Sequence, residues 1–432
     1  MIGTMTSSPG RHRTSPRLQL VLLAGRTAAT ASRLAGRGSG ASIRGRVTMT
    51  LAPRALPELL ADRRVASVTG TNGKTTTTHF LTAAVKAGTP DGQRNVVTNA
   101  DGANLHHGIV SALGEAPDAT IAVLETDERV VADVVAMGNP EVLVLLNFSR
   151  DQLDRNHELT FLGRDWRAAL EGAAEHGPTV VANACDPLIV WVCQKARQVI
   201  WVDTKPRWTA DSTLCPNCDA VLTHGEDGWD CPGCELSQPA ADWWVEDHDA
   251  VEASGRRFHL DVQVPGSFNL TNATCALAAA IHMSIQPEDA LRGIATVESP
   301  AGRYATCTIS GTHCRLLLSK NPAGWTESLP LTTSDPLVLA IDAVAADGKD
   351  VSWLWDVDYE QLVGRTVICT GPRALDLAVR LQYAGVKHVV IEGLAQALSS
   401  PLLAGKWDSD HPIDVLSTYT PFQKLRRLGG LA

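Results

Sequence analysis

The sequence predicts an α/β protein with a central domain built on a doubly wound sheet and a second, C-terminal α/β domain. Short apolar runs alternate with stretches long enough for helices, and the clearest runs are 120–125, 141–146 and 178–183. Runs that are β-branched and apolar throughout are typical of parallel strands buried on both faces. The length of 432 residues is consistent with about two to three domains.

A glycine-rich turn follows the first predicted strand, Val65–Val68, and precedes a segment that can be helical. The turn reads Thr69-Gly70-Thr71-Asn72-Gly73-Lys74-Thr75-Thr76. Glycines let backbone N–H groups close on phosphate oxygens, and a helix N-terminus adds its dipole. Lys74 is expected to reach the β- and γ-phosphates and Thr75 to bind Mg²⁺. The generic Walker glycine is replaced by Val68, so the tighter string carries this prediction of an ATP site.

A carboxylate ends the strand predicted at 120–125, on the same sheet edge as the glycine-rich turn. Carboxylate oxygens are suitable Mg²⁺ ligands, so Glu125 is the first candidate for a magnesium anchor and Glu128 the second. The alternative is that the acids after the strand cap the next helix, which fits Asp127 well and Glu128 less well. The polar stretch 147–155 follows the next strand and is expected to face the same nucleotide.

Four of the ten cysteines form a paired cluster within 205–245, where the strand–helix rhythm breaks. Cys215-Pro-Asn-Cys218 and Cys231-Pro-Gly-Cys234 each direct two thiolates to one point, and together they complete a tetrahedral site. Four thiolates leave no open position, which predicts a structural Zn²⁺ ribbon, with a metal-free insertion as the alternative. The other six cysteines are scattered, so no disulfide framework is predicted and a reducing compartment is expected.

The first 57 residues carry nine arginines and no acid, although the net charge of the chain is −9. The apolar run 18–24 is shorter than the roughly 20 residues that span a bilayer, and closely following arginines argue against a signal peptide. Residues 17–36 are predicted to form a helix that either lies on an anionic membrane surface or packs on its own domain. The first dozen residues are predicted to be disordered. The acidic balance argues against nucleic acid as a partner.

Two weaker motifs follow the cysteine cluster. Asn269 and Asn272 lie three residues apart near the start of a small-residue helix, a spacing that also suits capping. Ser299-Pro-Ala-Gly302 is a predicted hinge followed by Arg303. The strands of the second domain are predicted at 314–319, 336–341, 366–370 and 388–391. The predicted organisation is a basic segment at 1–45, an ATP-binding domain at 46–300 with the insertion at 205–245, and a C-terminal domain at 301–432.

Taken together, these motifs resemble the Mur ligase family. The glycine-rich turn, the acid at 125, the turn at 266–273 and Gly302-Arg303 occur in the order of that family, and the resemblance extends from about residue 46 onward. It implies that Asn269, Asn272 and Arg303 contact the nucleotide. Narrower stretches resemble the Mur-ligase-like subunits of lipid II isoglutaminyl synthases, namely Asn147–Arg155, the Cys₄ insertion, Lys320–Gly324, Asp347–Asp356 and Ser417–Thr420. The chain departs from that pattern at 341–345, where asparagine is usual, and at Ala305, where an acid is usual.

The resemblance implies ATP-dependent amidation of the α-carboxylate of D-glutamate in lipid II, through an acyl phosphate attacked by ammonia. No cysteine lies in a Gly-x-Cys-x-Gly nucleophile turn, so the ammonia is expected from a GatD-like glutaminase subunit in a heterodimer. An aspartate of the second domain is implied to complete the Cys/His pair of that partner, with Asp350 as first choice and Asp356 as second. The alternative is that Asp350 only caps a helix starting near Val351. The expected location is the cytoplasm, with contact at the inner membrane face as an option.

Two other functions are compatible with these motifs. A ligase of the Mur or folylpolyglutamate type would add an amino acid, but the cysteine cluster and the 347–356 stretch disfavour it. A nucleotide-regulated scaffold would use the ribbon to bind a partner without turnover. ATP hydrolysis that depends on lipid II and ammonia distinguishes an enzyme from a scaffold, and the preferred nucleophile distinguishes the two enzymes.

Overall fold

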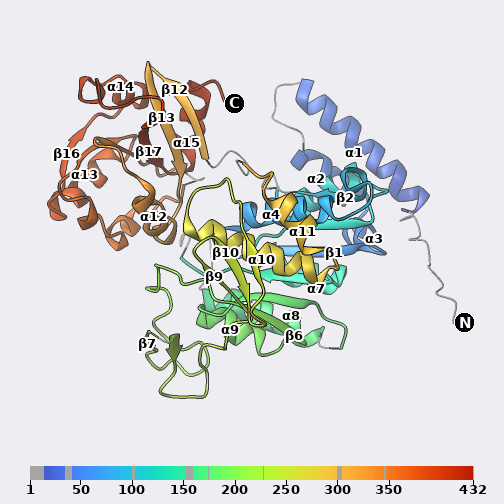
Figure 1. The fold of residues 1–432 in the computed structure, drawn as a ribbon. Helices are drawn as coiled ribbons and strands as arrows, with labels where there is room; N and C mark the ends of the chain where they lie inside the picture. The colour runs from blue at the N-terminus through green and yellow to red at the C-terminus, as the bar shows by residue number, and fades with distance from the viewer. Residues whose placement is uncertain are drawn as a thin grey trace, which may run out of the picture.

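The computed structural model describes residues 14–34, 41–99, 103–150, 159–173, 175–226, 228–298, 304–344 and 347–431. Within these residues the chain forms two lobes, each built on its own sheet (Figure 1). Strands between residues 64 and 259 build the sheet of the first lobe, and strands between 304 and 417 build the sheet of the second. The prediction of two α/β units is confirmed.

The sheet of the first lobe has nine strands in the order β11-β10-β9-β6-β5-β4-β1-β3-β2. Its strands are β1 Arg64–Thr69, β2 Val96–Thr98, β3 Ile121–Glu125, β4 Val142–Leu145, β5 Thr179–Asn183, β6 Gln198–Val202, β9 Trp243–Glu246, β10 Asp249–Glu252 and β11 Arg257–His259. Strand β1 pairs in parallel with both β3 and β4, and only the β9–β10–β11 edge is antiparallel. The three apolar runs predicted as strands are therefore β3, β4 and β5. Strand β6 and the antiparallel edge were not predicted, and the edge strands β9, β10 and β11 are only four, four and three residues long and include charged residues.

Helices cover both faces of this sheet, which is why its strands are apolar throughout. Along β4, Val142 and Val144 face one core and Leu143 and Leu145 face the other. The first core is closed by α4 Lys74–Ala87, α10 Ser267–His282 and α11 Pro287–Ile294. The opposite face is covered by α3 Ala55–Leu60, α6 His106–Glu115, α7 Val131–Gly138, α8 Leu159–Gly172 and α9 Pro187–Cys193. The short helix α5 Gly92–Asn95 leads into β2.

The predicted N-terminal helix is α1 Pro16–Leu34, which packs with α2 Ala41–Leu51 on the first lobe (Figure 1). Its inner face buries Leu18 and Leu22 in the core that α3 and α6 share, so this face packs on its own domain. Its outer face exposes Leu20 and Leu23. Among the helices in the described part of the chain, none combines the length and apolar character needed to cross a bilayer. The predicted disorder of the first dozen residues concerns a stretch outside the described residues.

The sheet of the second lobe has six strands in the order β12-β13-β17-β14-β15-β16. Its strands are β12 Tyr304–Ile309, β13 Thr312–Leu318, β14 Leu337–Ala340, β15 Thr366–Thr370, β16 Lys387–Val390 and β17 Ile413–Ser417. Only the β12–β13 pair is antiparallel. The helices of this lobe are α12 Pro322–Ser328, α13 Ala374–Tyr383, α14 Leu394–Leu398 and α15 Tyr419–Leu428. In place of the helix expected near Val351, the chain forms a short 3₁₀ helix, η3 Ser352–Asp356.

The cysteine insertion projects from the first lobe beside α9 (Figure 1). It contains a two-stranded hairpin, β7 Thr223–Gly225 and β8 Gly228–Asp230. Trp229 anchors the insertion, because it is buried in the same core as α8 and α9 and its Nε1 donates to the carbonyl oxygen of Ala184. The insertion is thus packed on the sheet by apolar contacts rather than tethered only by its two connections.

Candidate functional site

The glycine-rich turn adopts the conformation that its sequence predicts. Strand β1 ends at Thr69, and Gly73 is the residue that precedes the first residue of α4. Gly70 and Gly73 have φ of +137° and +86°, values that side chains other than glycine rarely adopt. A Cβ on Gly70 would lie 2.9 Å from the backbone nitrogen of Asn147, and one on Gly73 would lie 2.7 Å from Oδ1 of Asn272. Both glycines are therefore required for conformation and for close packing.

The polar stretch after β4 holds this turn, which we call the phosphate loop (residues 69–76). The N–H of Thr71 donates to the Asn147 carbonyl at 2.9 Å, and the N–H of Asn72 donates to the Asn147 side-chain oxygen at 2.9 Å. Asn72 Nδ2 also donates to Ser149 Oγ at 2.9 Å. The stretch predicted to face the nucleotide thus lies against the phosphate loop as far as Ser149; residues 151–155 lie outside the described residues.

Lys74 lies at the start of α4 and is paired within the site. Its Nζ is 3.0 Å from Oε1 of Glu128 and also donates to the carbonyl oxygens of Gly70 and Thr71. Both side chains of the ion pair are largely buried, at 12% and 14% exposed. Glu128, the second candidate for a magnesium anchor, is therefore the partner of the phosphate-loop lysine.

Glu125 lies at the carboxyl end of β3, next to the phosphate loop strand. The Asn99 side chain holds the backbone of Glu125: it accepts from the Glu125 N–H and donates to the Glu125 carbonyl oxygen, both at 2.8 Å. Oε1 accepts from Asn104 Nδ2 at 3.0 Å, whereas Oε2 is buried and has no hydrogen-bond partner among the described residues. A buried carboxylate oxygen without a partner fits a site for a cation. Thr75, the other side chain predicted to bind Mg²⁺, is also buried.

Asn269 and Asn272, at the start of α10, are brought to the same place. Asn269 Nδ2 donates to the Pro265 carbonyl at 2.7 Å, and its Oδ1 accepts from Asn272 Nδ2 at 3.1 Å. Asn272 lies against Gly73 of the phosphate loop, so the pair does more than cap its own helix. Arg303, the third residue of this predicted set, lies outside the described residues.

A cavity of about 240 Å³ opens between the lobes beside the phosphate loop. Its wall includes Lys320, from the stretch 320–324 named above, and residues that the sequence alone did not indicate, among them Trp208, Asp211 and Glu327. Burial raises the pKa of Glu327, whose carboxylate accepts from the N–H of Arg207 at 3.1 Å. These residues come from the linker after β6 and from the start of the second lobe, and no local pattern in either segment predicted a shared cavity.

Side chains also join the two lobes directly. Asn321 Nδ2 donates to Asn72 Oδ1 of the phosphate loop at 3.1 Å. Arg150 donates through Nε to Asp211 at 2.5 Å and lies 3.6 Å from a carboxylate oxygen of Asp356 in the second lobe. Polar contacts thus join the second lobe to the first at two points, the phosphate loop and Arg150.

The two candidate aspartates of the second lobe have different surroundings. Asp350 is exposed, and its Oδ1 accepts from the N–H of Ser352 at 2.8 Å, a bond that lowers its pKa. This local contact to the first residue of η3 is close to the one described by the alternative, although Val351 and not Asp350 occupies the N-cap position. Asp356 is partly exposed beside Arg150. Asp347, in the same segment, is buried and accepts from the N–H of Thr420 at 2.7 Å, which ties the segment to α15.

The four cysteines of the insertion form one cluster. Their Sγ atoms lie within 4.8 Å of one another, with Cys215 and Cys234 at 3.6 Å and Cys218 and Cys231 at 3.4 Å. Ligand sulfurs of a tetrahedral zinc site are about 3.8 Å apart, so the cluster fits such an ion. The N–H groups of the residues two positions after Cys215 and Cys231 point to those sulfurs at 3.4 Å, as in metal-binding knuckles. His224 instead contacts the Ser212 carbonyl.

The comparison with known proteins agrees with this geometry. The chain matches the Mur ligase middle domain over residues 68–280 and the MurT ligase C-terminal domain over 318–422. The lipid II isoglutaminyl synthase (glutamine-hydrolyzing) subunit MurT of Streptococcus pneumoniae is 28% identical over 441 residues, which cover 95% of this chain and 96% of the relative. The MurT subunit of Staphylococcus aureus is 28% identical over 362 residues, covering 78% and 81%.

The chain therefore contains a Mur ligase middle domain and a MurT C-terminal domain, and it resembles the MurT subunits over most of its length. Its fold is that of the Mur ligases: a pseudomurein peptide ligase type C from Methanothermus fervidus superposes with a TM-score of 0.62 at 17% identity, covering 86% of this chain and 80% of that one. MurF from Acinetobacter baumannii superposes with a TM-score of 0.61 at 17% identity, covering 91% and 80%. The Mur ligase middle domain and the likeness to MurT subunits make the chain a ligase of the ATP-dependent carbon–nitrogen class.

Proposed function

We propose that the chain is the synthetase subunit that amidates the α-carboxylate of D-glutamate in the lipid II stem peptide, giving D-isoglutamine. The observation that carries the proposal is the phosphate loop at the edge of a cavity between the two lobes, in a chain related to MurT over nearly its whole length. A carboxylate is a poor electrophile, and phosphorylation by ATP gives it a leaving group. Ammonia then attacks the carbonyl carbon, and phosphate departs as the amide forms.

In this proposal the phosphate loop, Gly70 to Thr76, and the N-terminus of α4 bind the phosphates of ATP. Lys74 would exchange its contact with Glu128 for the β- and γ-phosphates. Thr75 and Glu125 would hold Mg²⁺, which neutralises negative charge on the phosphates when bound. Asn269, Asn272 and Arg303 are proposed as further nucleotide contacts. These groups act by positioning and by electrostatic stabilisation, as phosphoryl transfer requires.

The cysteine cluster is proposed to bind Zn²⁺ through Cys215, Cys218, Cys231 and Cys234. Four thiolates fill a tetrahedral site, so this ion would stabilise the insertion and take no part in the reaction. Trp208 and Asp211, in the first part of the insertion, line the cavity. By stabilising the insertion, the ion would help to hold these two residues in place.

The ammonia is proposed to come from a GatD-like glutaminase that binds the second lobe. Asp350, with Asp356 as second choice, would complete the Cys/His pair of that subunit by orienting its histidine. An exposed apolar stripe lies on the same lobe: Leu375, Val379 and Tyr383 repeat every fourth residue of α13 and are 62%, 49% and 77% exposed. Outward faces of helices are usually polar, so this stripe supports a partner surface. Its Tyr383 ring contacts that of Trp355, within η3, at 5.3 Å.

The division into a basic segment at 1–45, an ATP-binding domain at 46–300 and a partner-binding domain at 301–432 is part of the same proposal. A location in the cytoplasm at the inner membrane face suits a lipid-linked substrate. The exposed Leu20 and Leu23 of α1, together with the arginines before residue 58, support such a contact.

Amidation of purified lipid II with ATP and Mg²⁺ tests the function. The chain is assayed with ammonium or glutamine as the nitrogen source, each with and without the glutaminase subunit. We expect product with ammonium from the chain alone, and with glutamine only when the glutaminase is present. Incorporation of an amino acid with no amidation under any condition would contradict the proposal and favour a ligase that adds amino acids. ATP hydrolysis that ignores lipid II and ammonia would favour a scaffold.

A further inference from the structure

Asn72 lies inside the phosphate loop, and each of its polar groups is hydrogen-bonded to a residue outside that loop. Its N–H and carbonyl oxygen are both bonded to the side chain of Asn147, at 2.9 and 3.0 Å. Its Nδ2 donates to Ser149 Oγ at 2.9 Å, and its Oδ1 accepts from Asn321 Nδ2 at 3.1 Å. The first three bonds stay within the first lobe, but the fourth comes from a residue 249 positions away, in the second lobe. The phosphate loop is therefore held from both lobes.

Asn321 is placed so that it can make this bond. It is 2% exposed and is the N-cap of α12, with its Oδ1 accepting from the N–H of Gly324 at 2.9 Å. Because the cap uses Oδ1, the amide nitrogen is directed to Asn72. Ser319 braces the same turn, since its Oγ contacts Ser328 Oγ at 2.6 Å and donates to the Gly324 carbonyl at 3.1 Å. The side chain of Asn321 thus connects a rigid turn of the second lobe to the phosphate loop.

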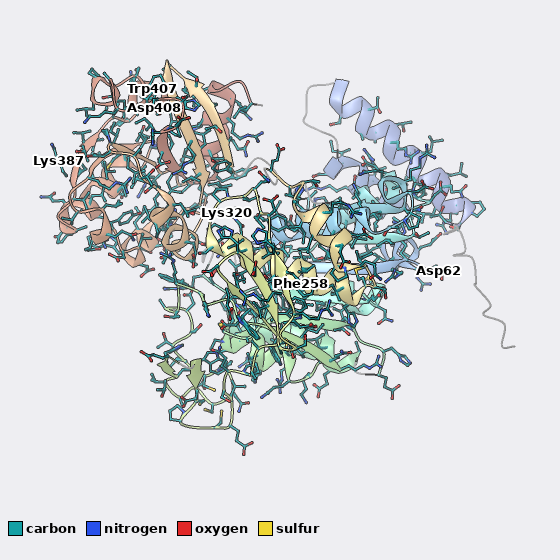
Figure 2. All side chains as sticks on the ribbon, in the orientation of Figure 1. Asp62, Phe258, Lys320, Lys387, Trp407 and Asp408 are labelled. Carbon is teal, nitrogen blue, oxygen red and sulfur yellow. The ribbon has the colours of Figure 1, made fainter. Side chains whose placement is uncertain are left out.

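The residue before Asn321 makes this connection relevant to the cavity. Lys320 lines the cavity, and Figure 2 shows it where the second lobe meets the first. The other charged residues that line it in the described part of the chain are the acids Asp186, Asp211 and Glu327. An anionic nucleotide and an anionic acceptor therefore need the positive charge of Lys320 close by. The bond that holds Asn321 against the phosphate loop also sets the distance from Lys320 to the loop.

We propose that Asn321 is a positioning residue of the nucleotide site: by bonding to Asn72 it orders the phosphate loop from the second lobe. The inference rests on the proposed function, because it takes ATP to bind at this loop. A residue that only capped α12 would need its oxygen and not its amide N–H. The amide N–H of Asn321 acts on the nucleotide through Asn72 and does not touch the reacting atoms.

Two substitutions separate the cap from the link. Asn321→Ser keeps an oxygen that can cap α12 but loses the donor to Asn72, and serine is nearly as good a cap as asparagine. Asn321→Asp also keeps the cap but sets a carboxylate against Asn72 Oδ1. The full-length chain is tested for binding of a non-hydrolysable ATP analogue with Mg²⁺ by calorimetry. Hydrogen–deuterium exchange of residues 69–76 is measured alongside.

For Asn321→Ser we expect an affinity about threefold to tenfold weaker, the effect of one hydrogen bond, and faster exchange in the phosphate loop. Asn321→Asp should be weaker still. Both variants should keep a thermal unfolding temperature close to that of the parent, because the cap remains. In the amidation assay, KM for ATP should rise. A purely structural role would instead reduce the active fraction and leave both KM for ATP and the affinity of folded protein unchanged.

Two outcomes overturn the inference, and they are distinguishable. If the parent chain binds the analogue and amidates lipid II, and Asn321→Ser binds it with equal affinity and equal loop exchange, the inference alone fails. If the parent chain binds no nucleotide, the proposed function fails and the inference with it. As a further check, Asn72→Ala and Asn321→Ser should each weaken binding, and the double variant should be no weaker than Asn72→Ala alone.

Discussion

Replacing Glu125 by glutamine separates the role of this side chain in the site from its role in the fold. The side chain is 1% exposed, its Oε1 bonds to Asn104, and its Oε2 has no hydrogen-bond partner among the described residues. An unsatisfied buried acceptor costs about 1–3 kcal/mol, and a buried charge costs more than an amide of the same shape. The metal-free Glu125→Gln variant should therefore be as stable as the parent, or more stable by up to about 2 kcal/mol.

The same substitution should abolish the response to magnesium. Glutamine lacks the charge with which Glu125 would hold Mg²⁺ beside Thr75, so amidation should fall by a factor of about 10² to 10³. A ligand that binds only the folded state raises stability in proportion to its occupancy. The parent should therefore melt higher with ATP and Mg²⁺ than with ATP and a chelator, whereas Glu125→Gln should melt at the same temperature in both.

Thermal unfolding of both proteins, without ligand, with Mg²⁺, with ATP and chelator, and with ATP and Mg²⁺, measures these effects. A change of 1 kcal/mol shifts the melting temperature of a domain of this size by about 2–4 °C. Glu128→Gln is the matched control, because it removes the partner of Lys74 and should keep the magnesium increment. A Glu125→Gln variant that loses more than about 2 kcal/mol without metal and keeps the full magnesium increment would refute the reasoning.

Four further predictions concern the insertion and the second lobe. Cys218→Ser should reduce bound zinc from about one ion per chain to nearly none and expose the insertion to proteases. Cys185→Ser, which lies outside the cluster, should keep the metal, and an unchanged zinc content in Cys218→Ser would exclude the site. Asp350→Asn should lower glutaminase turnover of the assembled complex by about 10² to 10⁴ with little effect on ammonium-dependent amidation, and a larger loss in Asp356→Asn would transfer the role to that residue. Tyr383→Glu should weaken glutaminase binding about tenfold or more, while Leu402→Glu, at an exposed position elsewhere on the lobe, should not. Equal losses of affinity in the two variants would argue against the α13 stripe as the partner surface. Hydrogen bonds from Arg380 lower the pKa of Glu360 to about 2 from 4.5, so this pair stabilises the fold above about pH 4.5 and less as the pH falls. In Glu360→Gln the melting temperature should therefore fall less steeply with decreasing pH than in the parent, and an equally steep fall would count against this.

Several features of the chain follow from local sequence alone. The apolar runs that form β3, β4 and β5 can be predicted as strands, because parallel strands are buried on both faces and are therefore apolar throughout. The phosphate loop can be predicted because glycines stand at the two positions between a strand and a helix, Gly70 and Gly73, where the backbone has positive φ. The paired Cys-x₂-Cys knuckles are equally local, since each holds its two sulfurs by its own turn, and the cluster formed as predicted. In each case the geometry is set by residues within a few positions of one another.

Only the tertiary structure decided which distant groups meet at the site. The contacts of Asn72 with Asn147 and Asn321, the pairing of Lys74 with Glu128, and the bridge from Arg150 to Asp356 join segments far apart in the sequence. Short strands at the antiparallel edge escaped prediction for the same reason, because pairing across the sheet and not local propensity stabilises them. A single sequence specifies such contacts only through the packing of the whole fold, whereas helices, strands and turns depend on neighbours along the chain.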